Sequence, residues 1–433
     1  MASLEKPDRV SIKQLDELTI GKIAAGEVVE RPAQVVKELV ENSIDAGANR
    51  VRVEIERGGF DRITVIDDGH GIPKDELSLA ITRHATSKLS SPDDLSSIET
   101  KGFRGEALAS IGAVSELVVA SRIGDGDGVQ IRVDNGIVGD VEAAGIAPGT
   151  RIDVLSLFAK VPARLSFQRR PSTETAAIVD VGVQMALAEP NAGILIEVDG
   201  RKVLDCPPTE SAEDRLYDLF GSTSSELIPL TSSQADSDAP GGEKWTGWIS
   251  PPGLNRSRAD DVHILVNGRP VSPGPFLQSV RRGYHTRLMV GRHPIGVLLL
   301  SLPADEVDVN VHPTKREVRL KNSWRVLERL ERSIKHTLSQ IATRPEASED
   351  TVLEGISERA GPIPPESPAT SLPEWANAAS ENQTVQTRFS SIRSSVETTA
   401  RVQSKSTSEY ITEQDTLPGM DSEPTTPSLS SED

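Results

Sequence analysis

The stretch KELVENSIDAG, residues 37–47, decides how the first part of the chain folds. Upstream of it, Pro32 suits the first turn of a helix, and Gly47 suits the C-terminal cap. Between them a stripe recurs at helical spacing, made of Val35, Val36, Leu39, Val40, Ser43 and Ile44. Glu38, Asn42 and Asp45 project from a second stripe, because residues three and four positions apart stack above one another.

The second stripe is polar and allows two interpretations. For a carboxylate taken alone, a solvated helix face is the ordinary one. The alternative is a site in which an acid and an amide flank one small ligand, such as a metal ion with its waters. The helix leaves both open, and the surrounding segments have to decide between them.

Composition bounds the class of protein. The 433 residues have room for two or three domains. A net charge of -18 argues against a chain coated in nucleic acid, but it leaves room for a local basic groove. Cys206 is the only cysteine, which excludes a disulfide framework and a multi-cysteine zinc site. Because no apolar stretch reaches the length of a bilayer and no leader opens the chain, we expect a cytoplasmic protein without a membrane partner.

The chain divides into three zones by composition. Residues 1–210 alternate amphipathic helices with strands such as VRVEIERG and ITVIDDG. Residues 211–340 form a second αβ mixture, with the strands VHILVNGR and IGVLLLSLP and a closing helix near residues 324–338. Residues 341–433 form an acidic segment rich in Ser, Thr and Pro, and we expect this segment to be a disordered linker or tail.

The segment ITVIDDGHGIP, residues 63–73, predicts a strand that runs into a glycine-containing loop. Asp67 ends the strand, and Gly69 and Gly71 permit close approach of a ligand. A buried aspartate at this place can accept a hydrogen bond from an exocyclic amine such as that of adenine. Leaving the acceptor unpaired would cost ~1–3 kcal/mol, enough to discriminate between bases. An ordinary Asp/Gly turn is the alternative.

Two further segments carry basic residues: RHATSKL (83–89), and KGFRGEALASI (101–111), which also contains glycines. The second predicts a glycine-rich turn that opens a helix with Glu106 and Ala107 in its first turn. Free backbone amides at a helix start suit a phosphate, although a flexible loop with a helix cap is the alternative. No Walker loop is present, and no GxGxxG follows a strand to open a helix. APGTRIDV (147–154) adds a glycine-threonine turn before a strand.

The order of these segments resembles the successive motifs of the GHKL ATPase superfamily, which includes type II topoisomerases, heat-shock chaperones, histidine kinases and MutL. IAAGEVVERPAQVVKELVENSIDAGA, RHATSKL and GFRGEALASI are most similar to MutL, and LFAKVPARLSF, VNGRPV and VDVNVHPTKREVRL extend the resemblance to about residue 340. It implies an α/β fold: a GHKL (Bergerat-type) α+β sandwich with helices on one face of a mixed sheet, then a ribosomal-protein-like βαβ domain.

The resemblance also implies residue roles. Glu38 would be the general base for the water that attacks the γ-phosphate of ATP, and Asn42 would ligate Mg²⁺. Lys315, from the second zone, would reach the γ-phosphate. The nucleotide would also contact Asp67, Gly69, Gly71, Thr86, Lys88, Gly102, Phe103, Arg104, Gly105, Glu106, Ala107, Leu108 and Thr150.

A DNA-binding groove is expected in the second zone, where arginines gather against the acidic average. The resemblance places the arginine of VNGR in such a groove, and solvated arginines are the alternative. Binding should be largely independent of sequence and weaken with salt. The candidates are Arg269, Arg281, Arg282, Arg287 and Arg292.

The function implied is a MutL-type mismatch-repair ATPase, in which ATP binding and slow hydrolysis gate dimerisation and clamping on DNA. It would relay mismatch recognition from a MutS-type protein to a downstream nuclease or helicase, with an ATP-dependent homodimer formed near residues 20–29. Because the sequence after residue 340 resembles a linker, we expect no endonuclease activity from this chain. The alternatives are a topoisomerase-like ATPase subunit and a nucleotide-binding scaffold without turnover.

Overall fold

The computed structural model describes residues 14, 16, 19, 25, 29–88, 101–102, 105–231, 242–308 and 318–342. The expected tail, residues 341–433, lies outside this part of the chain apart from residues 341 and 342. No helix within the described part is long and apolar enough to cross a bilayer.

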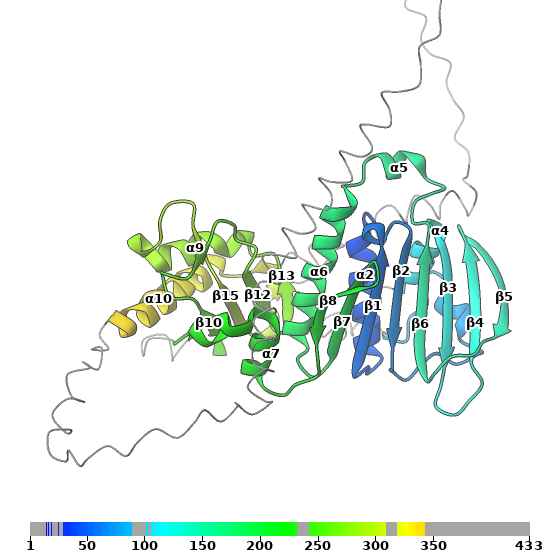
Figure 1. Cartoon of the computed structure of the whole chain (residues 1–433), viewed down its shortest axis with the longest axis horizontal. Coiled ribbons are helices and arrows are strands. Elements are labelled where there is room, and N and C mark those ends of the chain that lie inside the picture. Colours follow the sequence, from blue (N-terminus) through cyan, green and yellow to red (C-terminus); the bar gives the residue numbers. More distant parts are fainter. Residues whose placement is uncertain are drawn as a thin grey trace, which may run out of the picture. The chain divides into compact units, whose positions relative to one another are not determined.

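The first part of the chain forms an eight-stranded mixed sheet in the order β5-β4-β3-β6-β2-β1-β7-β8 (Figure 1). Only β1 and β7 pair in parallel, and every other neighbouring pair is antiparallel. The strands are β1 (Arg50–Glu56), β2 (Arg62–Asp67), β3 (Glu116–Arg122), β4 (Val129–Asp134), β5 (Ile137–Ala143), β6 (Gly149–Leu155), β7 (Gly193–Val198) and β8 (Arg201–Cys206).

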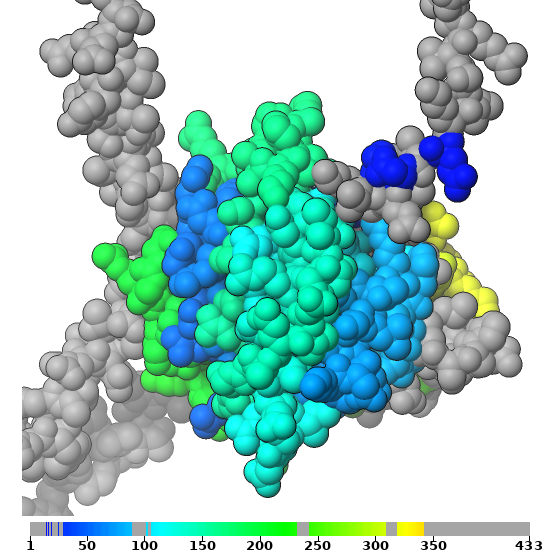
Figure 2. Space-filling view, turned by 90° about the vertical axis from the view of Figure 1, so that its right-hand side faces the viewer, coloured from blue at the N-terminus to red at the C-terminus, as the bar shows by residue number. Residues whose placement is uncertain are grey.

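Helices cover one face of this sheet. α2 (Pro32–Asp45) packs on β1 and β2 and also contacts α4 (Ala107–Ala113) and α6 (Pro171–Ala188), so the three belong to one layer. β1 alternates buried and exposed positions, as expected for a sheet with one covered face. Shorter helices are α3 (Leu77–Ala80) and α5 (Pro162–Ser166). The segments that run from β3 to β5 occupy the middle of the face seen in Figure 2.

The sequence of α2 explains where it begins and ends. Pro32 stands in the first turn, where its missing N–H costs nothing. The helix ends at Asp45, and Gly47 adopts a φ of 72°, a left-handed conformation that glycine adopts without strain. The apolar stripe predicted from the sequence is buried except for Ile44, which is half-buried, and it packs in the core that includes Val53, Ile63 and Val65.

The second part forms a five-stranded sheet in the order β13-β12-β15-β10-β9. Its strands are β9 (Ile228–Pro229), β10 (Lys244–Ile249), β12 (Val262–Val266), β13 (Arg269–Val271) and β15 (Gly296–Ser301). Small pairs join β11 (Asn255–Arg256) to β14 (His293–Pro294) and β16 (Val307–Asp308) to β17 (Arg319–Leu320).

The helices of this part are α7 (Ala212–Phe220), α9 (Gly274–Tyr284) and α10 (Ser323–Ala342). β12 and β15 are parallel, and α9 lies in the connection between them, which makes a βαβ unit. α9 and α10 pack together, and a core that includes Tyr284, Leu330 and Ile334 joins them to the sheet. The prediction of a second αβ unit is therefore confirmed.

Candidate functional site

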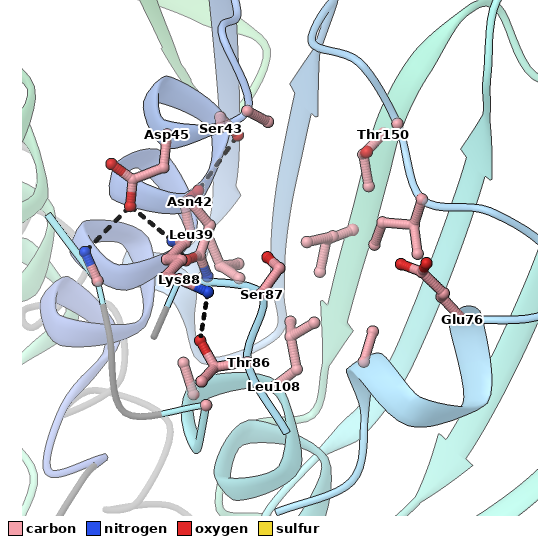
Figure 3. A pocket seen from close by; sticks show the side chains of 18 of the residues that line it. Leu39, Asn42, Ser43, Asp45, Glu76, Thr86, Ser87, Lys88, Leu108 and Thr150 are labelled. Carbon is pink, nitrogen blue, oxygen red and sulfur yellow. Dashed lines mark hydrogen bonds and ion pairs between the residues drawn. The ribbon is translucent and has the colours of Figure 1, made fainter. Parts of the chain in front are cut away.

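A cavity of about 980 Å³ lies between the helical layer and one part of the first sheet (Figure 3). Its walls come from α2, the loop after β2, residues 85–88, Gly102, residues 105–108 and β6. These segments are far apart in sequence, but β2 pairs with β6 in a register that sets Asp67 opposite Thr150. The volume suits a ligand of nucleotide size.

Asp67 is a buried residue of the cavity wall, at the last position of β2. One carboxylate oxygen, Oδ2, accepts a hydrogen bond from Ser43 Oγ at 2.7 Å. The other, Oδ1, accepts from the backbone amides of Gly69 at 3.0 Å and Thr150 at 3.1 Å. Burial raises the pKa of Asp67, and the three hydrogen bonds oppose that effect. Since a carboxylate has about four acceptor positions, one stays available on Oδ2 for a donor in the cavity.

Gly69 and Gly71 are required by the protein itself. A Cβ at Gly71 would stand 2.5 Å from the carbonyl oxygen of Arg122, and its φ is 77°. A Cβ at Gly69 would stand 2.9 Å from the carbonyl oxygen of Ala46. Gly71 lines the cavity and Gly69 does not. The close approach in both cases is therefore to the chain's own backbone, and the predicted contacts with a nucleotide stay a prediction.

The polar stripe of α2 faces the cavity. Glu38, Asn42 and Asp45 all line it and are half-buried, which favours the site interpretation of this stripe over a solvated helix face. Within the described part of the chain, no residue donates a hydrogen bond or forms an ion pair with the Glu38 carboxylate. Asn42 Oδ1 accepts a hydrogen bond from Lys88 Nζ at 2.8 Å, and the same ammonium contacts Asp45 Oδ2 at 2.6 Å (Figure 3).

The donor set of this wall fits Mg²⁺. It consists of amide and carboxylate oxygens, the ligands that this ion prefers, and it already attracts a cation in the form of the Lys88 ammonium. No cluster of three or more His, Cys, Asp and Glu ligands occurs among the described residues. The magnesium would therefore depend on ligands from water and phosphate oxygens, as is usual for it.

Two family models match the chain. Residues 30–147 match the "Histidine kinase-, DNA gyrase B-, and HSP90-like ATPase" family, and residues 217–339 match "DNA mismatch repair protein, C-terminal domain". The MutL of Rhizorhabdus wittichii is 46% identical over 315 residues, which cover 72% of this chain and 52% of that protein. For the MutL of Xylella fastidiosa strain M12, the identity is 41% over 356 residues, with 81% and 56% covered.

The chain belongs to the MutL family of DNA mismatch repair proteins. It spans about half the length of the curated relatives it matches. A solved structure described as the N-terminal domain of a DNA repair protein has a TM-score of 0.64 and 24% identity, and covers 74% of this chain and 98% of its own. That likeness concerns the fold. Residues 30–147 are thus a GHKL ATPase domain, as the order of motifs predicted.

The remaining residues that were predicted to contact the nucleotide either line the cavity or lie outside the described part of the chain. The residues that do line the cavity are Thr86, Lys88, Gly102, Gly105, Glu106, Ala107, Leu108 and Thr150. Phe103, Arg104 and Lys315 lie outside the described residues. Glu106 precedes α4 as its N-cap, one position earlier than the first turn expected for it. The roles of all these residues stay predictions.

The five candidate DNA-binding arginines differ in their surroundings. Arg281 and Arg282 are exposed in the last turn of α9, and Arg287 is exposed shortly after it. Arg269 and Arg292 are half-buried, and Arg292 Nε donates to Asn255 Oδ1 at 2.6 Å. Exposed arginines suit contacts with phosphates, whereas the guanidinium of Arg292 also supports the strand pair of β11 and β14.

Sequence reasoning missed three parts of the site. Ser43, counted in the apolar stripe, orients Asp67 through its hydroxyl. Asp45, which its spacing placed on the polar stripe with Glu38 and Asn42 but which was given no role, bonds three groups on two other segments. Ser121 donates to the carbonyl oxygen of Gly149 at 3.0 Å and accepts from the amide of Ile72 at 2.7 Å, which nothing in the sequence indicated.

Proposed function

We propose that this chain is a Mg²⁺-dependent ATPase that acts in DNA mismatch repair. The observation that carries the proposal is that one cavity is lined both by Glu38, Asn42 and Asp45 of α2 and by the buried acceptor Asp67. Membership of the MutL family and the GHKL ATPase domain support the same function.

The part of the cavity around Asp67 would hold the adenine. Asp67 would accept a hydrogen bond from the exocyclic amine at the position that its three protein donors leave open. Ser43 and the amide of Thr150 hold the carboxylate in place, so little orientation entropy is lost on binding. The hydroxyl of Thr150, 3.2 Å from Ser121 Oγ, lies in the same part.

The α2 wall would hold the phosphates and the metal. Bound Mg²⁺ would neutralise charge on the phosphate oxygens. Asn42 Oδ1 would be its protein ligand, and Glu38 would orient a water and take its proton during attack on the γ-phosphate. Thr86, Lys88 and the segment from Gly102 to Leu108 would surround the phosphates, with Lys315 reaching the γ-phosphate.

Replacement of Glu38 by glutamine tests the catalytic assignment. Loss of the base should reduce turnover by about 10²–10⁴-fold, while binding of a non-hydrolysable ATP analogue persists. Glu76→Gln removes a carboxylate from another part of the same cavity and is the matched control. Unchanged turnover in Glu38→Gln would remove Glu38 from the mechanism. Absence of turnover in the wild type would favour a scaffold without hydrolysis.

DNA binding is the second part of the proposal. The exposed Arg281, Arg282 and Arg287 would contact phosphates without reading sequence. The double variant Arg281→Glu/Arg282→Glu should weaken DNA affinity and reduce the salt slope by about 2. Arg201→Glu, at an exposed arginine on β8, is the control. Equal affinity of the double variant and the wild type at low salt would refute the groove.

The wider cycle follows from the family and belongs to the proposal. ATP binding would promote homodimerisation through residues 20–29 and close a clamp on DNA, relaying recognition by a MutS-type protein to a nuclease or helicase. Arg164 and Gln168 donate to the carbonyl oxygens of Val29 at 3.2 Å and Glu30 at 3.0 Å, so the residues at the end of this segment are tied to α5 and the residues after it. Size in solution with and without the analogue and Mg²⁺ tests the dimer.

A further inference from the structure

Asp45 joins three parts of the cavity wall. Its Oδ1 accepts a hydrogen bond from the backbone amide of Lys101 at 3.0 Å. Its Oδ2 accepts from the backbone amide of Gly102 at 3.0 Å and contacts Lys88 Nζ at 2.6 Å. The Asp45 side chain is only 8% exposed, so these bonds are partly shielded from water and are stronger than on an open surface. Asp45 therefore fixes both segments to the end of α2.

Lys88 brings its charge to the oxygen proposed as the metal ligand. Lys88 Nζ stands 2.8 Å from Asn42 Oδ1 and 2.6 Å from Asp45 Oδ2, with its side chain 20% exposed (Figure 3). The Thr86 hydroxyl accepts from the backbone amide of Lys88 at 3.1 Å, which fixes the local turn. The ammonium thus occupies a defined place between two oxygens of one helix.

An ammonium and a magnesium ion cannot share this place. Mg²⁺ requires its oxygen ligands at about 2.0–2.1 Å, so a metal on Asn42 Oδ1 would lie within about 4–5 Å of Lys88 Nζ. Two cations at that distance in a partly buried site repel each other strongly. Binding of Mg²⁺ to Asn42 Oδ1 therefore opposes the hydrogen bond from the Lys88 ammonium to the same oxygen, and the reverse.

We propose that Lys88 is an exchangeable internal counter-ion of the metal site, and that Asp45 is the positioning residue that holds it there. Lys88 covers Asn42 Oδ1 when no metal is bound and leaves that oxygen when the metal binds. Asp45 keeps its bonds to the amides of Lys101 and Gly102 throughout, so the exchange moves the Lys88 segment relative to a fixed wall. The inference rests on the proposed role of Asn42 as a metal ligand.

The exchange is tested by binding of Mn²⁺ alone to the full chain, measured from the loss of the free-ion electron paramagnetic resonance signal. Lys88→Met removes the competing charge with little loss of volume, so Mn²⁺ should bind at least about tenfold more tightly than to the wild type. Lys88→Arg keeps the charge and should match the wild type. Lys160→Met removes a lysine that pairs with Asp134 outside the cavity, and should also match it.

The direction of the effect separates exchange from damage, because a misfolded site binds metal less tightly, not more. Equal Mn²⁺ affinity of the wild type and Lys88→Met, including no detectable binding to either, overturns the inference. Asn42→Ala separates this failure from failure of the proposed function. If Asn42→Ala abolishes Mn²⁺-dependent binding of the ATP analogue while Lys88→Met has no effect on Mn²⁺ alone, the metal ligand stands and the exchange does not. If Asn42→Ala changes neither the Mn²⁺-dependent binding of the ATP analogue nor the binding of Mn²⁺ alone, both the proposed metal ligand and the exchange are refuted.

Discussion

Asp67→Asn should remove the preference for adenine while the fold persists. The change is isosteric, and the asparagine Oδ1 can keep the hydrogen bonds from the amides of Gly69 and Thr150. Its Nδ2 then takes the place of Oδ2 and meets Ser43 Oγ. That hydroxyl already has a second acceptor in the carbonyl oxygen of Leu39 at 3.2 Å, so it can accept from Nδ2 and still donate. We expect a change in the free energy of unfolding of about 1 kcal/mol or less.

The effect on the base is larger, because Nδ2 presents hydrogens where the carboxylate offered a lone pair. A hydrogen bond to a charged acceptor is worth about 1.5–3 kcal/mol, so affinity for an ATP analogue should fall by about 10- to 100-fold. A guanine base carries a carbonyl oxygen in place of the amine. The affinity of Asp67→Asn for a GTP analogue should therefore rise or stay constant, so the preference for ATP over GTP becomes smaller.

Isothermal titration calorimetry with the ATP and GTP analogues measures both affinities, and thermal unfolding checks the fold. Asp68→Asn is the matched control, because Asp68 accepts from the amide of Arg50 at 2.8 Å and does not line the cavity. An Asp67→Asn protein that unfolds normally and binds the ATP analogue within about twofold of the wild type would refute the assignment of Asp67 to the base.

Three further predictions concern Asp67, Gly71 and Cys206. Burial raises the pKa of Asp67, so the contribution of its carboxyl group to stability is fully present below the ordinary value of 3.8 and is lost as the pH rises through the raised value. In urea titrations, the unfolding free energy of the wild type minus that of Asp67→Asn should therefore fall across this pH range. A difference that rises with pH contradicts the prediction. Gly71→Ala should lower stability by about 1–3 kcal/mol more than Gly200→Ala, since both have positive φ but only Gly71 faces a backbone oxygen at 2.5 Å. Burial raises the pKa of Cys206 to about 12, so a disulfide reagent at pH 8 should label it only after unfolding, and rapid labelling of the native protein would contradict its burial.

Much of the helical wall was predictable, because helical periodicity is a local property. The spacing of Glu38 and Asn42 placed both side chains on one stripe, and the order of motifs named the family that the comparisons show. The stripe that the sequence left as either solvated or functional faces a cavity. Only the packing of residues 85–88 and 102 against α2 closes that wall.

The effects of long-range packing were beyond the reach of the sequence. Lys37 and Glu41 are one turn apart and form an ion pair at 2.7 Å, but only the packing of α2 against other helices as well as against the sheet buries that pair. Ser43 holds the Asp67 carboxylate and Ser121 holds the backbone of Ile72 through hydrogen bonds, although neither serine belongs to a recognisable pattern.

The sequence by itself determined the two αβ units, the helix that carries Glu38 and Asn42, and the family. Tertiary structure alone decided that Lys88 contacts both Asn42 and Asp45, and that the backbone of Thr150 supports Asp67. The physical reason is range: periodicity reflects neighbours one turn apart, whereas these bonds join atoms 46, 43 and 83 residues apart, and only the folded sheet and its helices set their distances.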